Sequence, residues 1–320
     1  MMRPLLFVCS ALALTAIAAG QSLRRGLVAA DVVMVGRQVG KQAHSDALVL
    51  HRVQVVEAVR GLNGERAVTV LDWPKLSLHQ RPTPRQTRLF CLQDASAVAQ
   101  RLGLPSSAAP YYKLVSWPGS HPLIGADRDQ DPILRLARLL ADSERGAAPG
   151  VTASALVQLA TNGDAKVRAE AARYLAERSD LRGKLAAVHW NRLVARAAGE
   201  VDDVDYKIAL ATLCAEQRLD GLVEALAVSL GPVRDPRYAR CVGRIGKRLH
   251  GEQATELLGK RLRNLAKPED REMVLMAIGA TDTKSALDAL GKMDQRDRAV
   301  AAALREHRSS RAKDAAAKRR

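Results

Sequence analysis

Residues 151–179 constrain the fold of this chain more than any other part of its sequence. The segment reads VTASALVQLATNGDAKVRAEAARYLAERS, with apolar residues at helical spacing on both sides of Asn162-Gly163. Gly163 can adopt the left-handed conformation that ends a helix, and Asp164 can cap the free amides of the next one. The segment therefore predicts a tight helical hairpin. Its two apolar stripes are Leu156, Leu159 and Ala160, then Val167, Ala171, Tyr174 and Leu175.

A hairpin of this size cannot bury its apolar face alone, so it needs similar hairpins stacked on it. Helical patterns do recur, at 183–198 with 203–218, 220–230 with 235–250, 252–266 with 269–279, and 283–290 with 294–307. Aligning the second helices places a small residue at each expected crossing, namely Ala172, Ala211, Gly243, Ala277 and Ala302. We predict a repeat array over residues 151–304. Because these positions are unevenly spaced, an irregular helical bundle is the alternative.

The stretch DAKVRAEAARYLA, residues 164–176, resembles the second helix of the HEAT-repeat family of α-solenoids. The residues that fit are Asp164, Val167, Arg168, Ala171, Ala172 and Leu175. Later copies depart from the pattern, since Lys207 replaces the arginine and the third and fourth copies lack a basic residue there. The resemblance implies an architecture but no particular activity, because such scaffolds carry many unrelated functions.

The N-terminus has the pattern of a secretory signal peptide over residues 1–20. Arg3 precedes an apolar run at 5–17, and Ala18 and Gly20 offer small residues for cleavage. The run is shorter than the roughly 20 residues that span a bilayer, so no stable membrane span is expected. We predict a protein exported to the periplasm, the cell envelope or the medium.

After a linker at 21–30, residues 31–130 have the composition of a β-rich domain. Segments rich in β-branched and aromatic residues alternate with Gly, Pro, Asn and Ser, which is typical of strands. They read DVVMVGRQV, ALVLHRVQVVEAVRG, RAVTVLD, TRLFCLQ and YYKLVSW. About five strands in this length predict a small closed barrel, because closure removes exposed edges. A β-sandwich is the alternative.

The order of VVMVGRQV, VQVVEAVRG and TRLFCLQ is similar to the oligonucleotide/oligosaccharide-binding-like (OB-like) barrel of tissue-inhibitor and netrin-type modules. The chain lacks the cysteine pairs of the animal members, so the resemblance depends on strand spacing and on the AVRG turn. A connecting helix and linker follow at 131–150. There Asp131 can cap a helix whose first turn contains Pro132.

Basic residues concentrate in the second half of a chain whose formal net charge is +16. Arg237, Arg240, Arg244 and Arg248 share one face of the predicted helix 235–250, and the next helix adds Lys260, Arg263 and Lys267. These seven residues predict a basic stripe for an anionic partner, with an ordinary solvated face as the alternative. A basic tail at 305–320, predicted as a fraying helix that becomes disordered, can bind polyanions or simply aid solubility.

Cysteine and histidine patterns predict no catalytic residue, metal site or cofactor. Without the signal, Cys91, Cys214 and Cys241 remain, which is no disulfide framework. Cys214 and Cys241 lie on neighbouring predicted helices and either pair or act as small buried hydrophobes. The seven histidines lack metal-ligand spacing, and the acidic run at 200–205 lacks the glycine and final glutamate of a calcium loop.

The sequence favours an exported, non-catalytic interaction scaffold that binds a protein or a polyanion through the repeats and the basic face. A nucleic-acid-binding helical-repeat protein is the first alternative, resembling the helical-repeat DNA glycosylases, with Arg237, Arg240 and Arg244 on phosphates. Export argues against it, as does a 3% aromatic content, which is poor for holding an extruded base. The second alternative is an enzyme or protease inhibitor with its site in the β-domain, where His51, His79 and His121 would converge.

Overall fold

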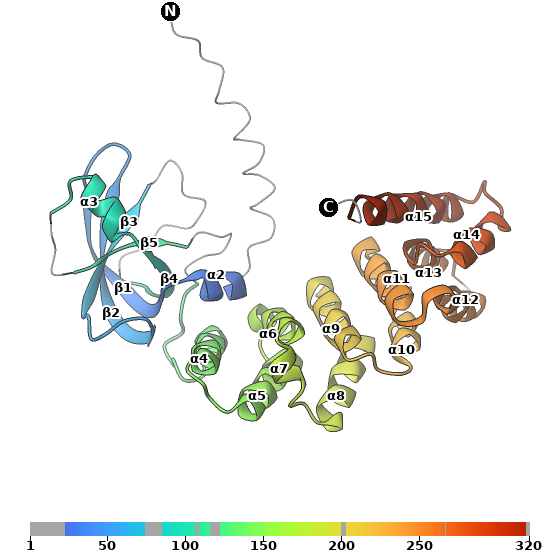
Figure 1. Ribbon diagram of the computed structural model, residues 1–320, viewed down its shortest axis with the longest axis horizontal. Helices are drawn as coiled ribbons and strands as arrows, with labels where there is room; N and C mark the ends of the chain where they lie inside the picture. The colour runs from blue at the N-terminus through green and yellow to red at the C-terminus, as the bar shows by residue number, and fades with distance from the viewer. Residues whose placement is uncertain are drawn as a thin grey trace, which may run out of the picture. The chain divides into compact units, whose positions relative to one another are not determined.

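The computed structural model describes residues 23–73, 85–105, 109–115, 122–199, 203–265 and 267–317. The chain forms two compact units, Met1–Ala147 and Ala148–Arg320 (Figure 1). None of the helices in the described ranges combines the length and the apolar character that crossing a membrane requires. The predicted signal peptide lies outside these ranges.

The first unit contains a closed barrel, which confirms the predicted barrel and excludes the β-sandwich. Its strands are β1 (Val32–Ala43), β2 (Val49–Arg60), β3 (Ala67–Asp72), β4 (Thr87–Asp94) and β5 (Tyr111–Leu114). They close in the order β1-β2-β3-β5-β4, and only the β3–β5 pair among them is parallel. Alternate residues such as Val53, Val68 and Phe90 point inward and form the core.

A glycine allows β1 and β2 to pack closely where their register shifts. A Cβ atom at Gly36 would lie 2.6 Å from Cγ1 of Val53, and the register is irregular between Val35 and Gly36. Such bulges bend long strands, which lets two twelve-residue strands curve around a small barrel.

Helix α2 (Leu23–Ala29) occupies most of the predicted linker 21–30, so that prediction was wrong over its described part. The reason is tertiary, because Leu27 is buried. The Arg60 guanidinium also donates to the carbonyl oxygens of Leu27 and Ala30, which satisfies the end of the helix. These contacts are invisible in the local sequence.

Helix α4 (Pro132–Glu144) belongs to the first unit and is not a free connector. The Asp131 side chain caps it as predicted, accepting from the amides of Ile133 and Leu134 at 3.0 Å each. Arg138 then makes two hydrogen bonds to the Glu57 carboxylate on β2, of 2.8 and 3.0 Å. The unit therefore ends near residue 147 instead of residue 130. A short helix, α3 (Ser96–Arg101), covers a second apolar cluster beside the barrel.

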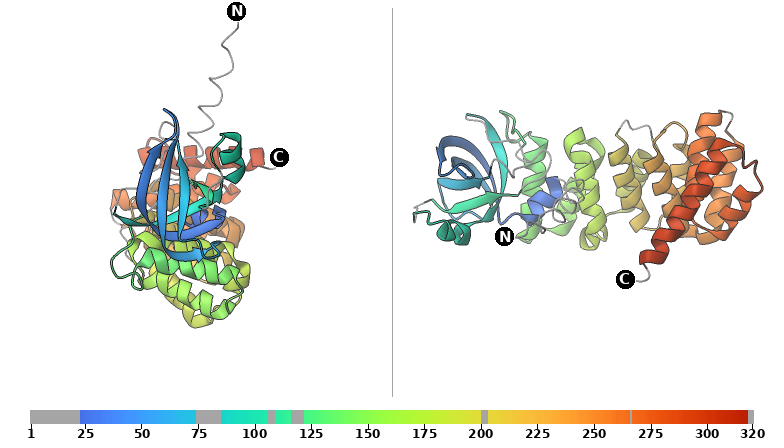
Figure 2. Two further views of the ribbon diagram at one scale, coloured as in Figure 1. Left: turned by 90° about the vertical axis from the view of Figure 1, so that its left-hand side faces the viewer. Right: turned by 90° about the horizontal axis from the view of Figure 1, so that it is seen from above.

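The second unit is a series of helical hairpins in two layers (Figures 1 and 2). The A layer contains α5 (Pro149–Asn162), α8 (Ala187–Ala198), α10 (Leu222–Val228), α12 (Ala254–Arg263) and α14 (Lys284–Gly291). The B layer contains α6 (Ala165–Glu177), α9 (Val204–Glu216), α11 (Pro236–His250), α13 (Pro268–Ala280) and α15 (Arg298–Ala317). Short pieces, α7 (Ser179–Arg182) and η1 (Gly251–Gln253), lie between hairpins. In each layer, a helix contacts its counterpart in the next hairpin.

The first hairpin forms where predicted, but its turn uses glycine for a different reason. Gly163 is extended, with φ −72° and ψ 170°, and is not left-handed. A Cβ atom there would lie 2.2 Å from the Leu159 carbonyl oxygen, so the position requires glycine for space. The Gly163 amide donates to that same oxygen at 3.0 Å and ends the helix.

The predicted small residues meet at the α11–α13 crossing. A Cβ atom at Gly243 would lie 2.1 Å from the carbonyl oxygen of Ala277, the small residue aligned with it. At the next crossing, Gly279 faces the Ala303 carbonyl oxygen, 2.3 Å from its hypothetical Cβ. The residue of α15 at this crossing is therefore Ala303 and not the predicted Ala302, one position earlier in the sequence.

Basic side chains of the B layer stack on aromatic rings of the next hairpin. The Arg168 guanidinium lies 4.7 Å from the centroid of the Tyr206 ring, and the Lys207 ammonium lies 5.3 Å from that of Tyr238. Arg168 and Lys207 occupy equivalent positions, so the same contact repeats between successive hairpins. The next equivalent residue is Ala239, which ends the series.

The predicted basic tail is helical over its described part, since α15 continues to Ala317. Glu306, His307 and Ser310 are buried against the array, and this packing supports the helix beyond residue 305. The local sequence does not predict these contacts, because they join residues far apart in the chain. Residues 318–320 lie outside the described ranges.

Candidate interaction face

Helix α11 carries four of the arginines of the predicted basic stripe, of which Arg237, Arg244 and Arg248 are exposed and Arg240 is partly buried. Asp235 caps its N-terminus, accepting from the Arg237 amide at 2.7 Å, and Pro236 occupies the first turn. Buried Tyr238 and Ile245 face the array. Helical spacing then places the predicted arginines on the opposite side of α11. These arginines differ in whether a carboxylate neutralises their charge.

Two of these arginines are paired with α9, the neighbouring B-layer helix. Arg237 donates to Asp205 at 2.9 Å, and Arg248 makes two hydrogen bonds with Glu216, of 2.6 and 3.0 Å. The bonds from Arg248 hold the pKa of Glu216 below its ordinary value. Similarly, Arg237 lowers the pKa of Asp235. Both arginines therefore bind neighbouring hairpins together, and their charge is largely neutralised.

The other two arginines of α11 differ from this pair. The Nε atom of Arg240 donates to Glu306 of α15 at 2.8 Å. Arg244 is exposed and makes neither a hydrogen bond nor an ion pair within the described residues. It is the one α11 arginine, in that part of the chain, that remains available as a free cation.

Of the remaining predicted residues, Lys260 and Arg263 lie on α12, in the other layer, whereas Lys267 is the N-cap residue of α13. Lys260 is 3.5 Å from Glu256 one turn earlier, a contact between exposed side chains. Arg263 and Lys267 are exposed and make no side-chain ion pair with the described residues. The seven residues are thus divided between two layers, and several are neutralised, so they form no continuous basic stripe.

The B layer instead presents what we call the α9–α11 face. It consists of Asp205, Ile208, Thr212 and Glu216 of α9 with Arg237, Arg240, Cys241, Arg244 and Arg248 of α11. The Arg237–Asp205 ion pair lies at one end of this face and the Arg248–Glu216 ion pair at the other. At its centre, the hydroxyl of Thr212 lies 3.9 Å from the Cys241 sulfur. The sequence did not identify Asp205 and Glu216 as partners of the arginines. The signal available was that residues 205 and 216 have the same separation as residues 237 and 248, with which they pair.

The three cysteines in the described part of the chain are free thiols and form no bridge. Cys91 and Cys214 are buried, and burial raises the pKa of each to about 12. Burial also raises the pKa of Cys241. The prediction of a small buried hydrophobe is therefore confirmed for Cys214, whereas Cys241 is only partly buried. Thiolate chemistry at neutral pH is disfavoured at all three.

In the barrel, His51 forms a buried pair with Asp72. The Nε2 atom of His51 lies 3.3 Å from an Asp72 carboxylate oxygen, and the strand register makes the two residues diagonal neighbours on the inner side of β2 and β3. His79 and His121, with which His51 was predicted to converge, lie outside the described residues. Among the residues described, no three His, Cys, Asp or Glu side chains form a group able to hold a metal ion.

The barrel also carries a groove of about 490 Å³. Leu50, Leu104 and Tyr111 give it an apolar part, and Lys41 and Arg52 are cations without a side-chain partner in the described ranges. None of the described residues that line it carries a carboxylate. The groove is therefore suited to a ligand or peptide that combines an apolar group with an anion.

No protein-family model matches the sequence of this chain, and no curated protein matches it significantly.

Proposed function

We propose that this protein is an exported, non-catalytic interaction scaffold whose helical array holds a protein partner on the α9–α11 face. The observation that carries the proposal is the composition of this face. Its terminal charges neutralise each other, and its centre offers Ile208, Thr212 and one free cation, Arg244. Such a mixture of uncharged and singly charged groups suits a polypeptide surface.

A protein partner fits the face better than a polyanion does. Asp205 and Glu216 already occupy Arg237 and Arg248. A polyphosphate would have to displace these carboxylates, and counterion release favours many free cations in a row. The few aromatic residues of the chain also provide little surface on which bases could stack.

We assign the array to the HEAT-like α-solenoids and the barrel to the OB-like modules of the tissue-inhibitor and netrin type. Support for the first comes from the DAKVRAEAARYLA segment, from the aligned pair Gly243 and Ala277, and from the repeated cation–ring stacking. Support for the second comes from strand spacing and closure. In the scaffold, the groove beside Tyr111 provides a second contact with the partner.

The partner surface can be tested with a photo-cross-linking amino acid. Placed at Thr212 in cells, it should give a specific cross-linked protein, because this residue is exposed at the centre of the face. At Val188, which is 60% exposed on the A layer, it should give none. Arg244→Glu should abolish the product at position 212 without lowering the melting temperature. Equal products at both positions would contradict the proposal.

Arg244 is the appropriate charge to reverse, and Arg240 is not. Arg240→Glu would place a second carboxylate beside Glu306, so lost capture and lost stability would be inseparable. Arg244 has no partner to lose within the described residues, and a surface substitution of this kind usually changes stability by less than about 0.5 kcal/mol.

Export is tested by cell fractionation and by sequencing the N-terminus of the native protein. We expect the protein outside the cytoplasm, with a mature chain beginning at Ala19 or Gln21, because the apolar run is followed by small residues. A cytoplasmic chain that retains Met1 would contradict export. The search for a partner would then begin with DNA and RNA.

A further inference from the structure

Helix α15 differs from the other B-layer helices in how it is held. It lies across α13 and reaches α11 (Figures 1 and 2). Its first half packs through buried Val300 and Ala303, and Ala303 meets Gly279 of α13 so closely that no side chain fits between them. Its remaining residues, 305–317, which we call its second half, turn Glu306, His307 and Ser310 toward the array. The character of the buried face thus changes from apolar to polar within one helix.

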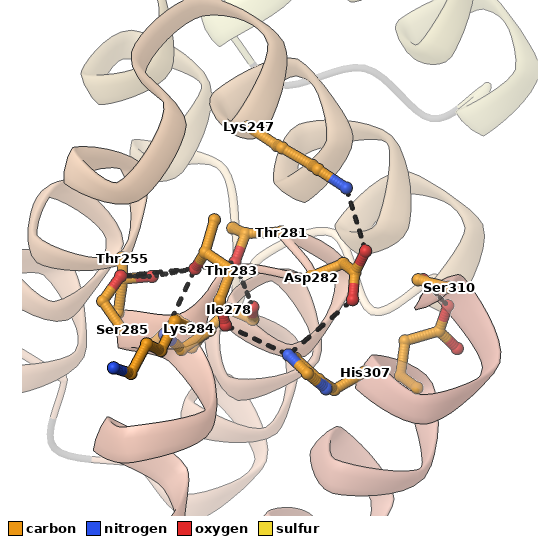
Figure 3. A network of polar contacts seen from close by, with 12 residues as sticks. Lys247, Thr255, Ile278, Thr281, Asp282, Thr283, Lys284, Ser285, His307 and Ser310 are labelled. Carbon is orange, nitrogen blue, oxygen red and sulfur yellow. Dashed lines mark hydrogen bonds and ion pairs between the residues drawn. The ribbon is translucent and has the colours of Figure 1, made fainter. Parts of the chain in front are cut away.

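The second half of α15 is held by hydrogen bonds and ion pairs (Figure 3). The His307 Nε2 atom lies 3.1 Å from the Thr283 carbonyl oxygen and 3.8 Å from the Asp282 carboxylate. Asp282 is itself bound by Lys247 of α11 at 2.9 Å. When this part of the helix leaves, water or another carboxylate can take over contacts of this kind, so the net cost of each lost hydrogen bond is small, whereas the apolar packing of the first half has no such replacement.

Glu306 of α15 binds Arg240 of α11 at a position where the carboxylate of another molecule could bind instead. The carboxylates that bind Arg237 and Arg248 come from α9, the adjacent helix of the layer, and from Asp235 at the start of α11, but Arg240 is bound by a residue of α15. Arg240 remains 38% exposed in this pair. Arg244, one turn further along α11, is free within the described residues. Of these two arginines on adjacent turns, only Arg240 has a carboxylate partner within the described residues.

The surroundings attract negative charge. Arg305, Arg308 and Arg311 are exposed along the second half of α15, close in sequence to Glu306. With Arg240 and Arg244, they make a local positive excess that draws an acidic segment toward the face.

We infer that the second half of α15 is a displaceable cover, and that an acidic segment of the partner protein binds Arg240 and Arg244 in place of Glu306. This inference rests on the proposed scaffold function and names the chemistry of its partner. A peptide is favoured over a nucleic acid because the group replaced is a carboxylate on a helix. The adjoining Ile208 and Thr212 are also uncharged, which breaks any row of cations.

The test uses the purified full chain and a fluorescein-labelled oligoglutamate peptide, with binding measured by fluorescence anisotropy at low salt. Glu306→Gln should tighten binding by about tenfold, if the cover is docked roughly nine-tenths of the time. Arg244→Glu should weaken binding by about the same factor. Glu216→Gln is the matched control, because it changes the net charge equally and releases Arg248 but leaves α15 in place. Equal tightening by Glu306→Gln and Glu216→Gln would overturn the inference.

Hydrogen exchange on the unmodified protein gives a second readout that needs no variant to fold. Adding the peptide should raise amide exchange over residues 305–317 and leave residues 298–304 protected, because only the polar half is released. Binding without increased exchange at 305–317 would overturn the cover. A single-stranded DNA oligonucleotide that binds more tightly than the peptide, and gains from Glu306→Gln, would overturn the acidic peptide. Cross-linking at Thr212 remains an independent test of the scaffold in either case.

Discussion

Gly243→Ala is expected to lower the free energy of unfolding by about 3 kcal/mol, at the upper end of typical overpacking costs. The added Cβ atom would lie 2.1 Å from the Ala277 carbonyl oxygen and 2.9 Å from the Ala280 Cβ. Both contacts are with a neighbouring helix, so α11 and α13 would have to separate. Urea denaturation followed by circular dichroism measures the change.

Gly259→Ala provides the matched control on α12. No atom lies within 4 Å of a Cβ placed at Gly259, so the substitution adds helix propensity without a clash. It should raise the free energy of unfolding by about 0.5–1 kcal/mol. If both substitutions stabilised the protein, the close α11–α13 crossing would be disproved.

Leu175→Ala is expected to lower the free energy of unfolding by about 2–5 kcal/mol, because it removes buried methyl groups and leaves a cavity. Leu175 is 0% exposed in the first hairpin. The same urea titration measures the effect. The comparison is Leu287→Ala on α14, where 39% exposure predicts a cost below about 1 kcal/mol.

A cost near zero at Leu175 would mean that this hairpin is not packed into the array. A cost at Leu287 equal to that at Leu175 would instead indicate that Leu287 is covered in solution, by a partner or by a second copy of the chain. The two substitutions together therefore separate burial within the unit from burial between molecules.

Local patterns predicted the helical hairpins well because helix formation and capping depend on residues close in sequence. The stripe that contains Leu156 and Leu159, and the cap at Asp131, required no knowledge of distant contacts. Strand alternation likewise predicted the barrel. Local patterns did not predict helix α2 or the buried contacts of α15, because Arg60 and Arg240 supply bonds from far along the chain.

The candidate site was predicted only in part. Periodicity predicts that the arginines of α11 share one face, since that depends on helical geometry alone. Whether each charge is free depends on which carboxylate a neighbouring helix brings to it. Arg237, Arg240 and Arg244 have the same local pattern, yet one faces Asp205, one faces Glu306 and one faces solvent.

The amino-acid sequence by itself determined the elements of this protein: a five-stranded β-region, the order of the hairpins, and the small residue at the α11–α13 crossing. Tertiary structure alone decided the division into units, the course of α15 and the pairing of the basic residues. The physical reason is range. Propensity, capping and periodicity act within a few residues, whereas an ion pair such as Arg240 with Glu306 requires that two distant helices first be packed together.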